Sequence, residues 1–82
     1  MNESKNPLRK LLDFLARLDE NNIWYKLGHY RDTINVEVDF PGEKWEVEFF
    51  DDGQVEFERF VGDGKMYDEN ALEEFLKKQI EE

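Results

Sequence analysis

Alternation of apolar and acidic side chains in the middle of the chain limits its possible folds more than any other feature. Two runs show it: Ile34, Val36, Val38 and Phe40 alternate with Asn35, Glu37 and Asp39, and Trp45, Val47 and Phe49 alternate with Glu46 and Glu48. Side chains two positions apart lie on the same face of a β-strand. The pattern predicts antiparallel strands with one apolar face toward a core and one acidic face toward solvent.

The residues between these runs predict the turns and the registers. A four-residue loop from Pro41 to Lys44 would place Phe40 opposite Trp45. A three-residue loop from Asp51 to Gly53, with Gly53 in the left-handed region, pairs Phe49 with Val55 and keeps both faces consistent. A further strand, before the Arg31-Asp32 turn, covers about residues 23–30. Its predicted core face is Ile23, Tyr25, Leu27 and His29, and Gly28 is a candidate β-bulge.

A helix is predicted before the strands. Asn6 is a good N-cap, and Pro7 suits the first helical position, where no backbone N–H is needed. The expected buried stripe is Leu8, Leu11, Leu12, Leu15 and Leu18, with Phe14 beside it. Asn21 and Asn22 tolerate the left-handed conformation of a helix end.

A second helix is predicted at the end of the chain, after a flexible turn at residues 62–65. Asp68 is its expected cap, and Tyr67 is expected to pack on Leu72 as a hydrophobic staple. Its apolar stripe is Ala71, Leu72, Phe75, Leu76 and Ile80.

These elements predict one small domain over residues 1–82. The expected class is α+β, with the order α-β-β-β-β-α. The strands form an antiparallel meander in the order 1-2-3-4, and both helices pack on one face. Apolar residues make up 39% of the sequence, enough for one modest core in a chain of this length.

The charge distribution limits the partners of the chain. The net charge is −10, and residues 34–61 hold nine acidic side chains against two basic ones. Such a field repels nucleic acids and anionic membranes, so we expect neither as a partner and expect a basic protein instead. The lack of cysteine fits a reducing cytoplasm, and the sequence shows no signal peptide or membrane-length apolar run.

The predicted registers give a map of the outer sheet face. Lys26, Glu37, Glu48 and Glu56 form one cross-strand row, Trp24, Asp39, Glu46 and Glu58 the next, and Gly28, Asn35, Phe50 and Gln54 a third. One interpretation is a solvated face that keeps the sheet soluble. The other is an interface with aromatic residues around an acidic centre. That candidate interaction face is Trp24, Lys26, Glu37, Asp39, Glu46, Glu48, Phe50, Glu56, Glu58 and Phe60.

The sequence gives little support for a catalytic or cofactor-binding site. Strand carboxylates splay outward, so no metal site is predicted, and the lone His29 lacks the partners that a transition metal or a nucleophile would need. Glu48 and Glu56 could act as an acid–base pair only in a cleft, which an open sheet does not supply. No glycine-rich phosphate loop occurs, so we predict no enzyme and no cofactor.

The segment from Val36 to Gly53 resembles small uncharacterised bacterial proteins with the core VEV-x-x-PGE-x-WEVEFF-x-DG. The resemblance implies a hairpin fold and carries over no site residue. Size and charge are also similar to those of immunity proteins that neutralise bacterial toxins. The expected function is a protein-interaction module for a basic partner, as an immunity-type inhibitor or adaptor. The alternatives are a small-ligand or divalent-cation binder, or a structural homodimer.

Overall fold

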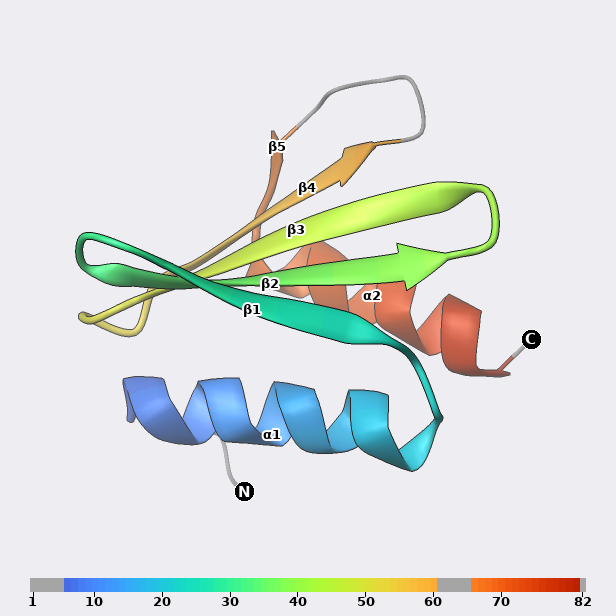
Figure 1. The fold of residues 1–82 in the computed structure, drawn as a ribbon, viewed down its shortest axis with the longest axis horizontal. Helices are drawn as coiled ribbons and strands as arrows, with labels where there is room; N and C mark the ends of the chain where they lie inside the picture. The colour runs from blue at the N-terminus through green and yellow to red at the C-terminus, as the bar shows by residue number, and fades with distance from the viewer. Residues whose placement is uncertain (1–5, 61–65, 82) are drawn as a thin grey trace.

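The computed structural model describes residues 6–60 and 66–81. Its elements follow the order α1 (Pro7–Glu20), β1 (Tyr25–Tyr30), β2 (Thr33–Phe40), β3 (Glu43–Phe50), β4 (Val55–Phe60), β5 (Met66–Tyr67) and α2 (Glu69–Glu81) (Figure 1). The α+β class, the helix–four strands–helix order and the meander are confirmed. The two-residue β5 was not predicted; it pairs antiparallel with β4 and extends the sheet to the order β1-β2-β3-β4-β5.

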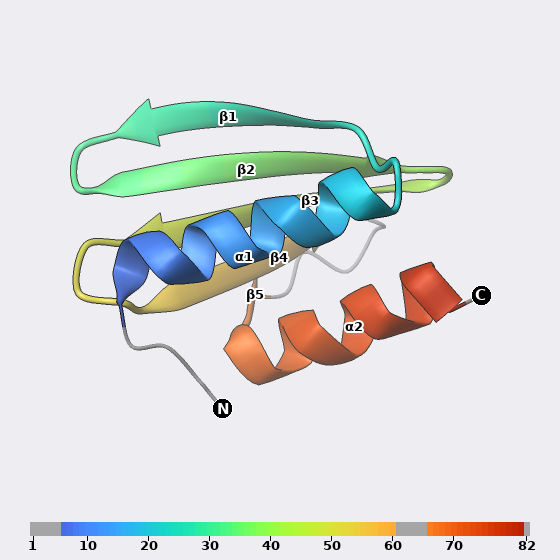
Figure 2. The same ribbon diagram turned by 90° about the horizontal axis from the view of Figure 1, so that it is seen from below.

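Both helices lie on one face of the sheet (Figure 2). α1 contacts β3, and α2 contacts β4 and β5. The helices are joined by ion pairs from Lys10 Nζ to Glu69 Oε1 at 3.0 Å and from Arg17 Nη1 to Glu73 Oε1 at 2.7 Å. The layer of helices therefore covers the middle and one side of the sheet.

Two of the three predicted registers are right. Phe49 pairs with Val55, and Gly53 has a φ of 94°, as the three-residue loop requires. The Arg31-Asp32 turn pairs Tyr30 with Thr33, and Gly28 pairs with Asn35 in an unbroken ladder, so the candidate bulge at Gly28 does not form.

The predicted register between β2 and β3 is wrong. The turn has two residues, Pro41 and Gly42, so Phe40 pairs with Glu43 and Val38 with Trp45. Gly42 has a φ of 85°, and a type II turn requires a positive φ at this position and often has proline before it. Val47 consequently lies opposite Val36 of β2, whereas the four-residue loop would have placed it opposite Val38; on the other side it lies opposite Phe57 of β4.

The core lies between the sheet and the helices. Its largest fully buried side chains are Trp45 and Phe57, whose ring centroids lie 4.8 Å apart. Phe40 still contacts Trp45, diagonally, with 4.5 Å between ring centroids. Leu72 and Leu76 of α2 are buried as predicted, and Tyr67 packs on Phe57 and Phe75.

The buried stripe of α1 is narrower than expected. Leu11, Phe14 and Leu18 are buried, and Phe14 packs on Phe49 with 5.5 Å between ring centroids. Leu8 and Leu12 were assigned to the core but are 60% and 41% exposed. The helix touches the sheet at β3, so only one narrow face of it meets the core.

β1 is an edge strand, and its predicted core face is partly buried only in the first half. It begins at Tyr25, and Ile23 and Tyr25 are partly buried, but Leu27 is 55% exposed and His29 is exposed. The residues point to the inner side as predicted. α1 reaches β1 at Tyr25, whose hydroxyl donates a hydrogen bond to Asp19 Oδ1 at 3.0 Å, but it leaves Leu27 and His29 open.

The helix ends form as predicted. Asn6 Oδ1 accepts a hydrogen bond from the Arg9 backbone N–H, and Asn22 adopts a φ of 56° after the end of α1. Asp68 Oδ1 accepts from the Ala71 backbone N–H at the start of α2. The flexible turn expected at residues 62–65 lies outside the described residues.

Candidate interaction face

The face of the sheet turned away from the helices, called the outer face below, carries four cross-strand rows. They are Trp24, Asp39, Lys44 and Phe60; Lys26, Glu37, Glu46 and Glu58; Gly28, Asn35, Glu48 and Glu56; and Tyr30, Thr33 and Phe50. Trp24 joins the first row because the Asp39 backbone N–H donates to the Trp24 carbonyl oxygen at 3.3 Å. All ten predicted residues lie on this face, but the rows are rearranged by the corrected β2–β3 register.

Glu46, and not Glu48, is the centre of the acidic rows. Glu46 lies directly between Glu37 and Glu58, whereas Glu48 lies between Asn35 and Glu56. Partial burial raises the pKa of Glu46, and the nearby carboxylates of Glu37, Glu58 and Glu48 raise it further, against the opposing effect of Lys44. Negative charge is therefore least favourable at the middle of this face.

The lysines of the outer face gather on one glutamate. Lys26 Nζ lies 3.7 Å and Lys44 Nζ 3.9 Å from the same Glu37 oxygen, Oε1. Among the described residues, no basic side chain lies within ion-pair distance of the four remaining glutamates on this face: Glu46, Glu48, Glu56 and Glu58. Glu48 has a different partner, the hydroxyl of Thr33 at 3.2 Å, which also lies close to Asn35 Oδ1 and to the Tyr30 carbonyl.

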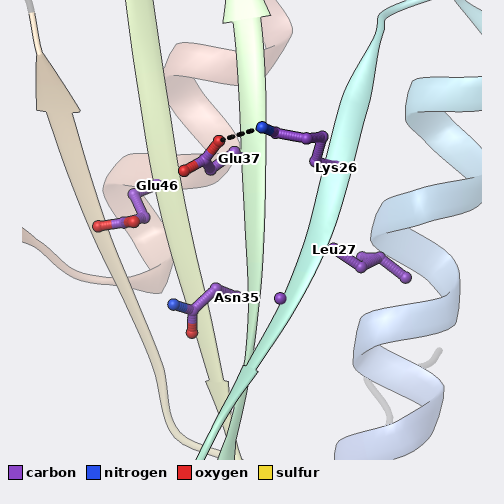
Figure 3. Close-up of a pocket in the computed structure, with 6 residues that line it drawn as sticks. Lys26, Leu27, Asn35, Glu37 and Glu46 are labelled. Atoms are coloured by element: carbon purple, nitrogen blue, oxygen red, sulfur yellow. Dashed lines mark ion pairs between the residues drawn. The ribbon is translucent and has the colours of Figure 1, made fainter.

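A shallow depression of about 240 Å³ lies at Gly28 (Figure 3). Its lining residues are Lys26, Leu27, Gly28, Asn35, Glu37 and Glu46. The missing side chain of Gly28 opens it: a Cβ built there would come no closer than 3.8 Å, to Asn35 Cβ. In Figure 3, Asn35, Glu37 and Glu46 project to one side of the sheet, whereas Leu27 projects toward α1.

Aromatic side chains border the acidic rows at both strand ends. Trp24 and Phe60 stand at the two ends of one row and are 61% and 45% exposed, and Tyr30, in the last row, is 58% exposed. Phe50 was expected to be an exposed anchor but is only partly exposed, beside Thr33. Three exposed aromatic groups therefore surround the carboxylates.

A second polar cluster, which the sequence did not predict, lies on the inner side of the sheet. Glu43 Oε1 accepts hydrogen bonds from Trp45 Nε1 at 2.9 Å and from Arg59 Nε at 3.0 Å, and Glu43 Oε2 accepts from Gln79 Nε2 at 2.9 Å. The Arg59 guanidinium also lies 4.4 Å from the centroid of the Phe75 ring. The hydrogen bond to Glu43 raises the pKa of Arg59 above its ordinary value. The cluster holds the end of α2 against the sheet.

The geometry adds little in favour of metal or acid–base chemistry. Within residues 6–60 and 66–81, no three histidine or carboxylate side chains are grouped so that they could hold a metal ion. His29 is exposed, with Nε2 3.0 Å from the Arg31 carbonyl oxygen. Glu48 and Glu56 lie opposite each other on the open outer face.

Comparisons of the chain with protein-family models, with curated proteins and with solved structures found no match. No helix in the described part of the chain is long and apolar enough to span a membrane.

Proposed function

We propose that the chain is a non-enzymatic protein-interaction module that binds a basic partner through the outer face of its sheet. The observation that supports this most is the position of Glu46 between Glu37 and Glu58, with both nearby lysines drawn to Glu37. Three neighbouring strands thus hold carboxylates side by side, an arrangement that costs stability in the free protein.

A basic partner would remove that cost. A cationic side chain placed over Glu46 turns repulsion among the carboxylates into attraction, and the acidic field speeds encounter with a positively charged surface. The exposed Trp24, Tyr30 and Phe60 supply the large, rigid contact area that commonly carries binding energy. An immunity-type inhibitor or an adaptor, acting in the cytoplasm against a basic protein, combines these properties.

One observation favours a second function, binding of a small cationic ligand or a divalent cation. The depression at Gly28 brings Glu37, Glu46 and the Asn35 side chain to one place. Its shallowness makes this the weaker proposal, since ligand sites are usually concave enough to bury most of the ligand. If the depression binds a divalent cation, the melting temperature should be higher in millimolar calcium or magnesium than in sodium at equal ionic strength.

A peptide titration tests the proposed interface. An arginine-rich peptide with one or two aromatic residues, added to the ¹⁵N-labelled protein, should shift backbone amide signals of β2, β3 and β4. Glu46→Lys should weaken the binding about tenfold or more, because it reverses charge at the centre of the face. Glu74→Lys is the matched control: it makes the same change of charge at an exposed position on α2 and should weaken binding much less.

Equal weakening by both variants would mean that the peptide senses only net charge. Shifts spread evenly over the helices would place the interface elsewhere. Either result would contradict the proposal.

A further inference from the structure

The open edge of β1 differs in charge from the rest of the sheet. β2, β3 and β4 each carry at least two carboxylates, whereas β1 carries Lys26 and His29 and no carboxylate. Its side chains are exposed from Lys26 to Tyr30. Prolines and β-bulges often protect an edge strand from pairing with another chain, and β1 has neither. An uninterrupted exposed edge of this kind is a template for another strand.

The backbone groups of β1 that face this edge belong to alternate residues. Trp24 bonds toward β2, through its carbonyl oxygen and the Asp39 N–H, and in an antiparallel ladder the direction of bonding alternates along the strand. Lys26, Gly28 and Tyr30 therefore also bond toward β2. The N–H and C=O groups of Tyr25, Leu27 and His29 face outward.

An apolar strip of Leu8, Leu12 and Leu27 lies on the inner side of the sheet along the same edge. Lys10 and Arg17 of α1 reach α2, so the opposite flank of α1, which carries Leu8 and Leu12, faces the β1 side of the molecule. Leu27 of β1 projects toward α1 (Figure 3). Leu8, Leu12 and Leu27 are each more than 40% exposed.

We propose that a second copy of this chain covers the edge, with the two β1 strands antiparallel about a two-fold axis at Leu27. In this register Leu27 pairs with the Leu27 of the second copy, and Tyr25 pairs with its His29. All three outward-facing residues of each strand then form backbone hydrogen bonds. The two apolar strips meet beneath the joined sheet.

Charge complementarity selects this register. It places Lys26 opposite the Gly28 of the second copy, where the depression offers space and the carboxylates of Glu37 and Glu46 lie nearby. Trp24 falls opposite Tyr30 on the same side. A shift by two residues toward the N-terminus would set Lys26 against Lys26, which repels. The dimer joins the two outer faces on one side of a continuous sheet.

The chain's lack of cysteine allows a direct test of the register. Leu27→Cys should form a disulfide-linked dimer under mild oxidation, because directly opposed hydrogen-bonded residues have Cα atoms about 5.5 Å apart. His29→Cys alone should not cross-link, because the two His29 positions would be separated by four residues along the strands, about 13 Å. A mixture of Tyr25→Cys and His29→Cys should yield the mixed dimer.

Sedimentation equilibrium of the full chain tests the assembly itself. The wild type should reach twice the monomer mass of 9.9 kDa, and Leu27→Lys should remain folded and monomeric. Phe60→Lys, an equal change of charge at an exposed apolar residue in β4, is the control and should leave the dimer intact. A wild type that stays monomeric up to millimolar concentration, or a dimer that survives Leu27→Lys, would overturn the proposal.

Discussion

On the inner side of the sheet the carboxylate of Glu43 accepts three hydrogen bonds, whereas on the outer face Glu46 lies between two further glutamates. Both residues belong to β3 and both are partly buried. Glu43 has the Arg59 guanidinium, the Gln79 amide and the Trp45 indole within hydrogen-bond distance; Glu46 has mainly other carboxylates around it. One strand therefore carries a carboxylate that stabilises the fold and another whose charge works against it.

This contrast indicates what each face contributes. Buried polar groups normally acquire partners within the fold, as Glu43 does. An arrangement of like charges that the fold leaves without partners is one that an external cation can complete. The free energy of folding comes from the inner side, and the capacity to bind a basic partner is proposed for the outer face.

The two tryptophans should show the largest difference between the faces. Trp45 is fully buried against Phe40, Phe57 and Phe75, so Trp45→Ala should lower the free energy of unfolding by about 3–5 kcal/mol. Trp24 is 61% exposed, so Trp24→Ala should change it by less than about 0.5 kcal/mol. Urea unfolding of both variants measures this. A comparable loss in Trp24→Ala would show that the outer aromatic residue supports the fold.

Removing a carboxylate from the inner side or from the outer face should give the next largest difference in unfolding free energy. Glu43→Ala removes the acceptor of Arg59, Trp45 and Gln79 and should cost about 1.5–3 kcal/mol of unfolding free energy. Glu56→Ala, which removes a carboxylate opposite Glu48, should be neutral or slightly stabilising. If the two substitutions were equally destabilising, the faces would not differ in how they accommodate charge.

The hairpin around Asp51 to Gly53 could be predicted because a two-residue Asp-Gly turn would pair Phe49 with Glu56 and mix the faces, whereas the three-residue loop pairs Phe49 with Val55. The Pro41-Gly42 turn could not, because registers two residues apart give the same inner and outer sets. Because of that ambiguity, the predicted register placed Glu48 at the centre of the acidic rows, where the structure has Glu46. The membership of the outer face was therefore predictable from alternation, but its cross-strand neighbours were not.

Long-range contacts explain the other differences. Glu43 was expected in a loop, and it joins the strand beside Arg59 and Gln79, which are distant in sequence. The available signal was a glutamate two positions before Trp45 on the same face of β3, diagonal to Arg59, which pairs with Trp45. Leu8, Leu12 and Leu27 match apolar patterns, but neither helix covers them.

Acidification should reveal the strain at Glu46. The pKa of this carboxyl is raised above its ordinary value of 4.5, so the folded state is favoured when Glu46 is protonated and loses stability as pH rises through that pKa. Glu46→Gln should therefore be more stable than the wild type at pH 7, by roughly 0.5 kcal/mol, and equal to it below about pH 4. Thermal unfolding between pH 3.5 and 7 gives the comparison. A constant difference across that range would assign the effect to something other than charge.

The proposed role of the outer face rests on a charge arrangement that is unfavourable to the free protein and favourable to a basic partner. Glu46→Lys tests it when unfolding free energy and affinity for the arginine-rich peptide are measured on the same sample at low salt, beside Glu74→Lys. We expect Glu46→Lys to gain about 0.5–1 kcal/mol of unfolding free energy and to lose affinity, and Glu74→Lys to do neither to a similar extent. A Glu46→Lys variant that is less stable than the wild type, or that binds the peptide as well, would contradict it.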